Sequence, residues 1–82
     1  MSLYISHVDA SVTHSQLAGF FLWYGELKSI EIVQEDTRNV VYIKYVNMYD
    51  NHKNQALQQE LTENNQARIY YTDHQYWIVT NK

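Results

Sequence analysis

The sequence predicts an α+β sandwich in which a four-stranded antiparallel sheet is covered on one face by two helices. Two observations lead to this prediction. Strand-like and helix-like segments alternate in the order β-α-β-β-α-β, which is typical of the ferredoxin-like, split βαβ arrangement. The chain of 82 residues is also long enough for one hydrophobic core and contains no linker, repeat or low-complexity segment. Residues 1–82 are therefore expected to form a single domain.

The first strand is predicted at residues 3–8, where side chains of different character alternate. Leu3 and Ile5 share one face of this strand, and Tyr4 and Ser6 share the other, because successive side chains of a strand point to opposite sides. A turn is expected at residues 9–11.

The first helix is predicted to begin at a capping box, Thr13-x-x-Gln16, in which each side chain accepts a hydrogen bond from the other residue's backbone N–H. Gly25 is expected to end the helix as a left-handed cap. One helical face carries apolar side chains at spacings of three, four and seven residues, which are Leu17, Phe20, Phe21 and Tyr24.

Two further strands are predicted at residues 27–33 and 40–46, joined by a polar turn at 34–37. Ile30 and Ile32 lie in phase on one face of the earlier strand.

The last third of the chain predicts a second helix and a small hairpin. Asp50 or Asn51 can cap the helix, whose apolar positions are Ala56, Leu57 and Leu61. Short strands at residues 68–72 and 75–80 are joined by a Thr-Asp-His turn.

These alternation patterns divide the side chains between a core and an open sheet face. The residues expected to be buried between the sheet and the helices are Ile5, Leu17, Phe21, Tyr24, Ile30, Ile32, Val41, Ile43, Ala56 and Ile78, together with Tyr45. The open face is expected to carry Tyr4, Val40, Tyr42, Lys44, Trp77 and Val79, although a slip of one residue in the last strand would bury Trp77 instead. Aromatic residues that gather on an exposed surface are typical of a binding site.

Composition and charge exclude several classes of function. A net charge of −3 argues against a sequence-independent polyanion binder, whose affinity comes from Lys and Arg, but is compatible with stacking and locally placed cations. The chain has no Cys, and its four His residues lack the spacing of a metal site. No nucleophile–base set or Gly-rich phosphate loop is present, so we expect neither catalysis nor a cofactor. Without a long apolar run or a basic leader, we expect an intracellular domain of the nucleus or cytoplasm.

The chain resembles an RNA-recognition motif over essentially its whole length. Residues 3–8, LYISHV, fit the family's first-strand hexamer, and residues 38–45, RNVVYIKY, resemble its third-strand octamer, which begins with a basic residue. The spacing of Leu17, Phe21 and the segment 24–27 between these elements also fits. The opening of the chain is most similar to domains of the poly(A)-binding-protein type. The resemblance implies one module of a larger protein that binds single-stranded RNA.

The resemblance implies roles for particular residues. Tyr4 and Tyr42 would stack on bases, Arg38 would reach a phosphate, and Lys44 would add a cation. Arg38 could instead form a cross-strand pair with Glu31. The RNA-contacting residues implied in this way are Tyr4, Ser6, Arg38, Val40, Tyr42 and Lys44, with Trp77 as a possible third stacking ring from its expected position on the sheet face.

The sequence also departs from the family pattern. Val40 occupies a position that is normally aromatic, Asn39 and Val41 replace small residues, and Glu35-Asp36 lies where a phosphate binder favours Lys or Arg. These changes reduce the expected affinity for RNA.

The alternative prediction is a domain of the same fold that binds protein, through the first helix or the sheet face. Leu22 points nearly opposite the apolar stripe of the first helix, and Trp23 lies on its flank, so both could contact a partner or a neighbouring domain. Arg68-Ile69-Tyr70 also resembles the Arg-x-Phe element of splicing-factor variants that bind tryptophan-bearing peptides.

Overall fold

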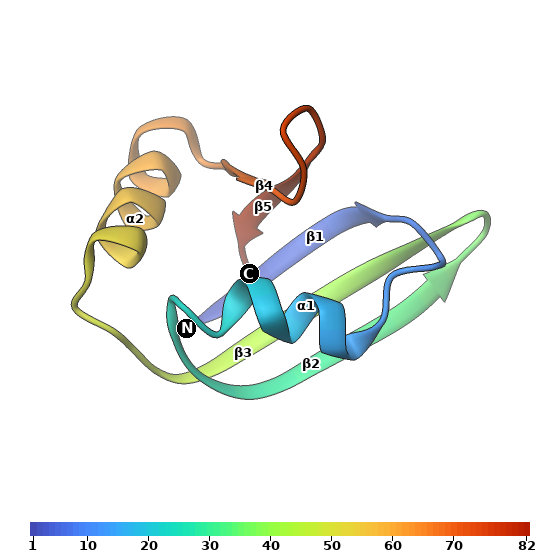
Figure 1. Cartoon of the computed structure of the whole chain (residues 1–82), viewed down its shortest axis with the longest axis horizontal. Helices are drawn as coiled ribbons and strands as arrows, with labels where there is room; N and C mark the ends of the chain where they lie inside the picture. Colours follow the sequence, from blue (N-terminus) through green and yellow to red (C-terminus); the bar gives the residue numbers. More distant parts are fainter.

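Seven elements follow one another along the chain in the computed structural model, which describes residues 1–82 throughout (Figure 1). They are β1 (Ser2–Val8), α1 (His14–Phe21), β2 (Gly25–Glu35), β3 (Arg38–Met48), α2 (His52–Asn64), β4 (Ala67–Tyr70) and β5 (Tyr76–Asn81). The predicted alternation of strands and helices is therefore confirmed, with strands β2 and β3 longer than expected.

All strands belong to one antiparallel sheet with the order β2-β3-β1-β5-β4, so that β1 lies at its centre between β3 and β5. The prediction of a four-stranded sheet is wrong, because the short β4 of the predicted hairpin pairs with β5 and adds a fifth strand to the sheet. Figure 1 shows the long β2–β3 hairpin on one side of β1 and the small β4–β5 hairpin on the other. The two chain ends lie close together, and the Lys82 N–H donates to the Ser2 carbonyl over 3.0 Å.

One hydrophobic cluster joins both helices to a single face of the sheet. It combines Leu17 and Phe21 of α1 and Leu57 and Leu61 of α2 with alternate residues of the strands. Its other members are Leu3, Ile5, Val8, Tyr24, Val41, Ile43, Tyr45, Ala67, Ile69, Trp77 and Val79. Ile30 and Ile32 pack against this cluster and are half-buried. The small α+β domain therefore has one covered sheet face and one open face.

The start of α1 follows the sequence prediction, but its end does not. The capping box is formed, with the Thr13 N–H donating to Gln16 Oε1 over 2.9 Å and the Gln16 N–H to Thr13 Oγ1 over 3.2 Å. The helix stops at Phe21, whose carbonyl accepts a hydrogen bond of 2.7 Å from the buried Tyr45 hydroxyl.

The prediction of Gly25 as a left-handed helix cap is wrong, because Gly25 is the first residue of β2 and has no positive φ. A side chain at this position would collide with the Asn47 carbonyl and would place Cβ 3.0 Å from Met48 Cα. A glycine therefore permits the close approach of β2 and β3 at this end of the sheet.

Helix α2 buries Leu57 and Leu61, two of its three predicted apolar positions, but not Ala56. Asn51 caps its first turn by accepting a hydrogen bond of 2.8 Å from the Asn54 N–H, and Asn65 ends it in the left-handed conformation, with φ of 62°. Ala56 is exposed rather than buried, because Asn54, Leu57 and Leu61 form the inward stripe.

Strand β5 has the opposite facing from the one predicted. Val79 pairs with Ile5, a core residue, so Trp77 also points into the core and Ile78 points to the open face. Trp77 is only 4% exposed and stacks on Tyr71 and Phe21, with ring centroids 4.4 Å and 6.0 Å apart. Burying an indole against these rings stabilises this register more than burying Ile78 would. The placement of Trp77 on the open face is therefore wrong.

Candidate functional site

Two tyrosines lie directly opposite each other in the middle of the open face. Tyr4 of β1 pairs in register with Tyr42 of β3, and their ring centroids are 5.1 Å apart at an interplanar angle of 49°. Both side chains are half-buried. The predicted pair of stacking rings is thus brought together on the face that no helix covers.

A lysine lies over this pair. Lys82 Nζ is 4.9 Å from the centroid of the Tyr4 ring and 5.7 Å from that of the Tyr42 ring. The sequence analysis did not identify Lys82, although the alternation of β5 could have: Thr80 pairs with Tyr4, so a residue two positions later returns to the same face.

Lys44, Ser29, Glu31 and Tyr42 line a shallow pocket of about 160 Å³ beside the tyrosine pair. Glu31 lies opposite Tyr42 and Ser29 opposite Lys44 in the register of β2 and β3. Lys44 is exposed and lies on the open face as predicted. The pocket therefore offers one cation and one carboxylate next to an aromatic ring.

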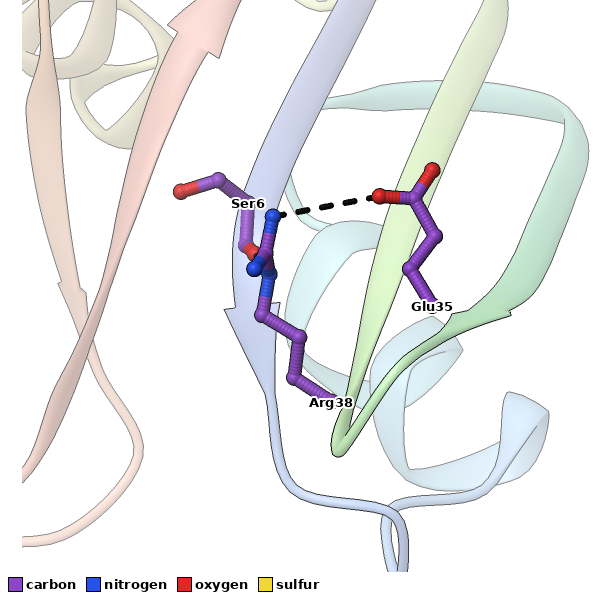
Figure 2. A network of polar contacts seen from close by, with 3 residues as sticks. All are labelled: Ser6, Glu35 and Arg38. Atoms are coloured by element: carbon purple, nitrogen blue, oxygen red, sulfur yellow. Dashed lines mark hydrogen bonds and ion pairs between the residues drawn. The ribbon is translucent and has the colours of Figure 1, made fainter.

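Arg38 is held by the end of the sheet (Figure 2). Its Nε donates a hydrogen bond of 2.8 Å to the Ser6 carbonyl, and its terminal NH2 nitrogen (Nη2) lies 3.8 Å from Glu35 Oε1. The predicted alternative, a pair with Glu31, is wrong, since Glu35 is directly opposite Arg38 in the β2–β3 hairpin.

The Ser6 carbonyl is available to Arg38 because β1 is irregular there. Ile5 pairs with Val41 but Val8 pairs with Asn39, so the register shifts between Ile5 and Val8 and the ladder is interrupted. The Ser6 side chain is exposed. The Arg38 side chain thus donates the hydrogen bond to the Ser6 carbonyl that the interrupted strand ladder does not provide.

Val40 is fully buried, with 0% of its surface exposed, and it is not a member of the main core cluster. The prediction that it lies on the accessible face is therefore wrong. A β-branched side chain at this position fills space between strands instead of offering a contact surface.

A second tyrosine pair occupies the face where Trp77 was expected. Tyr70 of β4 is opposite Tyr76 of β5, with ring centroids 5.1 Å apart, and Arg68 Cζ lies 4.9 Å above the Tyr76 ring. The sequence analysis missed this pair because it assigned the opposite facing to β5.

Four of the six Lys and Arg residues of the chain belong to the open face: Arg38, Lys44, Arg68 and Lys82. The contact between Arg38 and Glu35 is the only ion pair in the structure. Lys44, Arg68 and Lys82 therefore form no ion pair, although Glu31 lines the same pocket as Lys44, Glu60 accepts a hydrogen bond from the Arg68 backbone N–H, and the whole chain has a net charge of −3.

The C-terminal end of α1 exposes apolar side chains away from the sheet. Leu22 and Trp23 are 42% and 56% exposed, as predicted for the two protein-binding candidates. Phe20, expected in the buried stripe, is 36% exposed and touches Trp77 edge-to-face at 5.4 Å between centroids.

The titratable groups with shifted pKa values have structural roles. Burial raises the pKa of Tyr45 and, together with the negative charge of Glu60, that of Tyr24, whereas the Ser11 hydroxyl and N–H lower the pKa of Asp9. No group of three His, Cys, Asp or Glu residues is arranged to hold a metal ion, and no helix has the length and apolar character to cross a membrane. The chemistry that the open face offers is stacking and the binding of anions.

Comparison with family models, with curated proteins and with solved structures gives no match for this chain. The interpretation of the open face therefore rests on its own geometry.

Proposed function

We propose that this chain is an RNA-recognition-motif domain that binds single-stranded RNA on the open face of its sheet. The observation that carries the proposal is the pairing of Tyr4 with Tyr42 beneath an unpaired cation, Lys82. Exposed aromatic faces with adjacent cations are what single-stranded nucleic acid requires, because bases stack on the rings and phosphates attract the cations.

The order of the strands supports the fold assignment. In β2-β3-β1-β5, the two strands that carry Tyr4 and Tyr42 are neighbours at the centre, and both helices pack on the opposite face. This order is compatible with the split βαβ arrangement, with β4 added at one edge.

Lys82 does not block the site that it covers. An exposed contact between a cation and an aromatic ring is worth about 0.5–1 kcal/mol, whereas a base stacked on an aromatic side chain contributes about 1–3 kcal/mol. A base can therefore displace the Lys82 ammonium from the ring, and the released cation then lies within reach of the phosphate of the same nucleotide.

The contacts of Arg38 change its proposed role. Its hydrogen bond to the Ser6 carbonyl and its proximity to Glu35 reduce its availability for a phosphate. We assign the phosphate contacts mainly to Lys82 and Lys44, and we assign Arg38 to holding the irregular end of β1.

The proposal can be tested by titrating the 15N-labelled domain with short oligo(U), oligo(A) and mixed-sequence RNA. We expect chemical shift changes on β1 and β3, and loss of binding with a retained fold in the Tyr4→Ala, Tyr42→Ala double variant. The matched control is Leu22→Ser with Trp23→Ser, which alters exposed residues directly after α1 and should bind normally. Binding that survives loss of both tyrosines would contradict the proposal, and DNA of the same sequence tests whether the 2′-hydroxyl is read.

The second candidate is a protein-binding domain. The observation that favours it is the run of exposed apolar side chains at the end of α1, Phe20, Leu22 and Trp23. If this surface carries the function, the Leu22→Ser, Trp23→Ser variant of the full-length protein should lose its protein partners and the tyrosine variant should keep them.

A further inference from the structure

The β4–β5 hairpin repeats the construction of the central tyrosine pair. In both places two tyrosines from neighbouring antiparallel strands have ring centroids 5.1 Å apart, and a basic side chain lies 4.9 Å above one ring. Tyr70 is 52% exposed and Tyr76 is 38% exposed. Exposed rings of this size in the folded domain indicate a surface that is covered when a ligand binds.

The hairpin rings lie on the same face as the central pair. Thr80 pairs with Tyr4, so Ile78 and Tyr76, two and four residues earlier in β5, point to the side on which Tyr4 lies. Four residues of a strand span about 13 Å. A strand of RNA covers this distance with about two to four nucleotides, because stacked nucleotides rise about 3.4 Å each and unstacked ones rise more.

A hollow lies between β1 and β5, next to Tyr76 of the hairpin pair. Ser6 and His7 of β1 and Tyr76 and Ile78 of β5 line a pocket of about 440 Å³. It opens because the pairing of β1 with β5 ends at Ile5 and Val79, beyond which β1 is irregular. None of the four lining residues is acidic, so an RNA backbone can pass without facing a carboxylate there.

We infer that Tyr76, Tyr70 and Arg68 form a second base-stacking subsite that takes nucleotides of the same single-stranded RNA as the Tyr4–Tyr42 pair. This inference rests on the proposed function. The guanidinium of Arg68 has no ion-pair partner, since Glu60 accepts only from the Arg68 backbone N–H, over 3.3 Å. Arg68 is thus available for a phosphate, and the subsite has the ring and the charge that a nucleotide requires.

The inference predicts that affinity depends on the length of the RNA. A trinucleotide can occupy the central pair alone, whereas an octanucleotide reaches the hairpin and gains at least one stacked base, which corresponds to an affinity increase of about 5- to 150-fold. The test measures dissociation constants of trimeric and octameric oligo(U) for the wild-type domain, Tyr76→Ala, Tyr70→Ala and Tyr4→Ala. Tyr49→Ala serves as the control, because Tyr49 is an exposed tyrosine in the connection from β3 to α2.

We expect Tyr76→Ala and Tyr70→Ala to remove the gain of the octamer and leave trimer binding unchanged, Tyr4→Ala to weaken both, and Tyr49→Ala to affect neither. Unchanged trimer binding also shows that each hairpin variant is folded. If the wild type binds neither oligonucleotide, the proposed function fails and the inference fails with it. If the trimer binds through Tyr4 but the octamer gains nothing, or keeps its gain in both hairpin variants, only the second subsite is overturned, and the hairpin rings are left for a protein partner.

Discussion

Lys82 Nζ lies 4.9 Å from the Tyr4 ring and 5.7 Å from the Tyr42 ring, so one cation at the end of the chain is shared by two rings from different strands. The position is set by the backbone, because the Lys82 N–H donates to the Ser2 carbonyl. The cation is therefore held near the central pair before any ligand arrives, so that a base that displaces it from the rings leaves it close to the phosphate.

Lys82→Gln should reduce the salt dependence of RNA binding. Each phosphate contact on a single strand contributes about 0.7 to the slope of log affinity against log salt, and we expect a total slope equivalent to about one to three contacts with a trimer. Removing Lys82 should lower the slope by about 0.7. Fluorescence anisotropy at several salt concentrations measures this, with Lys53→Gln on α2 as the control. An unchanged slope would show that Lys82 contacts no phosphate.

Substituting the two glycines by alanine should have opposite effects on stability. Gly25→Ala places a methyl group against the Asn47 carbonyl and Met48 Cα and should destabilise the domain by about 1–3 kcal/mol. Gly19→Ala, within α1, meets no atom within 4 Å and should stabilise it by up to about 1 kcal/mol. Urea denaturation of both variants gives the two free energies of unfolding. Equal effects would contradict the close approach of β2 and β3 at Gly25.

The domain should lose stability in alkaline solution. Burial raises the pKa of Tyr45 above its ordinary value of about 10, so the unfolded chain releases that proton at a lower pH than the folded domain. The free energy of unfolding should be constant below about pH 10 and then fall by up to about 1.4 kcal/mol per pH unit for each such group.

Tyr45→Phe tests this assignment. At neutral pH it should cost about 1–3 kcal/mol, because the Phe21 carbonyl loses its hydrogen bond, but above pH 10 its stability should fall less steeply than that of the wild type. Tyr49→Phe, which removes the hydroxyl of a tyrosine that is 44% exposed, is the control. If the free energy of unfolding falls equally steeply above pH 10 in all three proteins, a group other than Tyr45 causes the loss of stability.

The two tryptophans should differ in fluorescence. Trp77 is 4% exposed and Trp23 is 56% exposed, so Trp23→Phe should leave a blue-shifted emission that acrylamide quenches poorly. Trp77→Phe should leave a red-shifted, easily quenched emission. The reverse pattern would show that Trp77 lies on the open face and that β5 faces the other way.

Much of the fold could be predicted because the spacing of apolar residues in the helices and strands agrees with the nearby capping and turn residues. The Thr13–Gln16 capping box and the alternation of β1 both lead to the observed elements. The facing of β5 could not be predicted in this way, since Trp77 and Ile78 are both suited to a core. The packing of Trp77 against Phe21 and Tyr71 decides it, and the contact with Phe21 joins residues far apart in the sequence.

The positions of the residues at the centre of the candidate site could be predicted, and those at its edges could not. Tyr4 and Tyr42 follow from alternation within two regular strands. Arg38 and Val40 were misjudged because they adjoin the irregular end of β1, where the register shifts. Tyr76 was missed, and Arg68 was considered only as part of a peptide-binding element, because the facing of their hairpin depends on β5.

The scarcity of ion pairs has a practical consequence for measurements on this domain. The one ion pair, Arg38 with Glu35, is exposed and contributes at most about 1 kcal/mol, so raising the ionic strength should hardly alter the folded fraction. Added salt can therefore be varied over a wide range as a probe of ligand binding alone. A loss of RNA affinity at high salt then reflects the number of phosphate contacts and not partial unfolding of the domain.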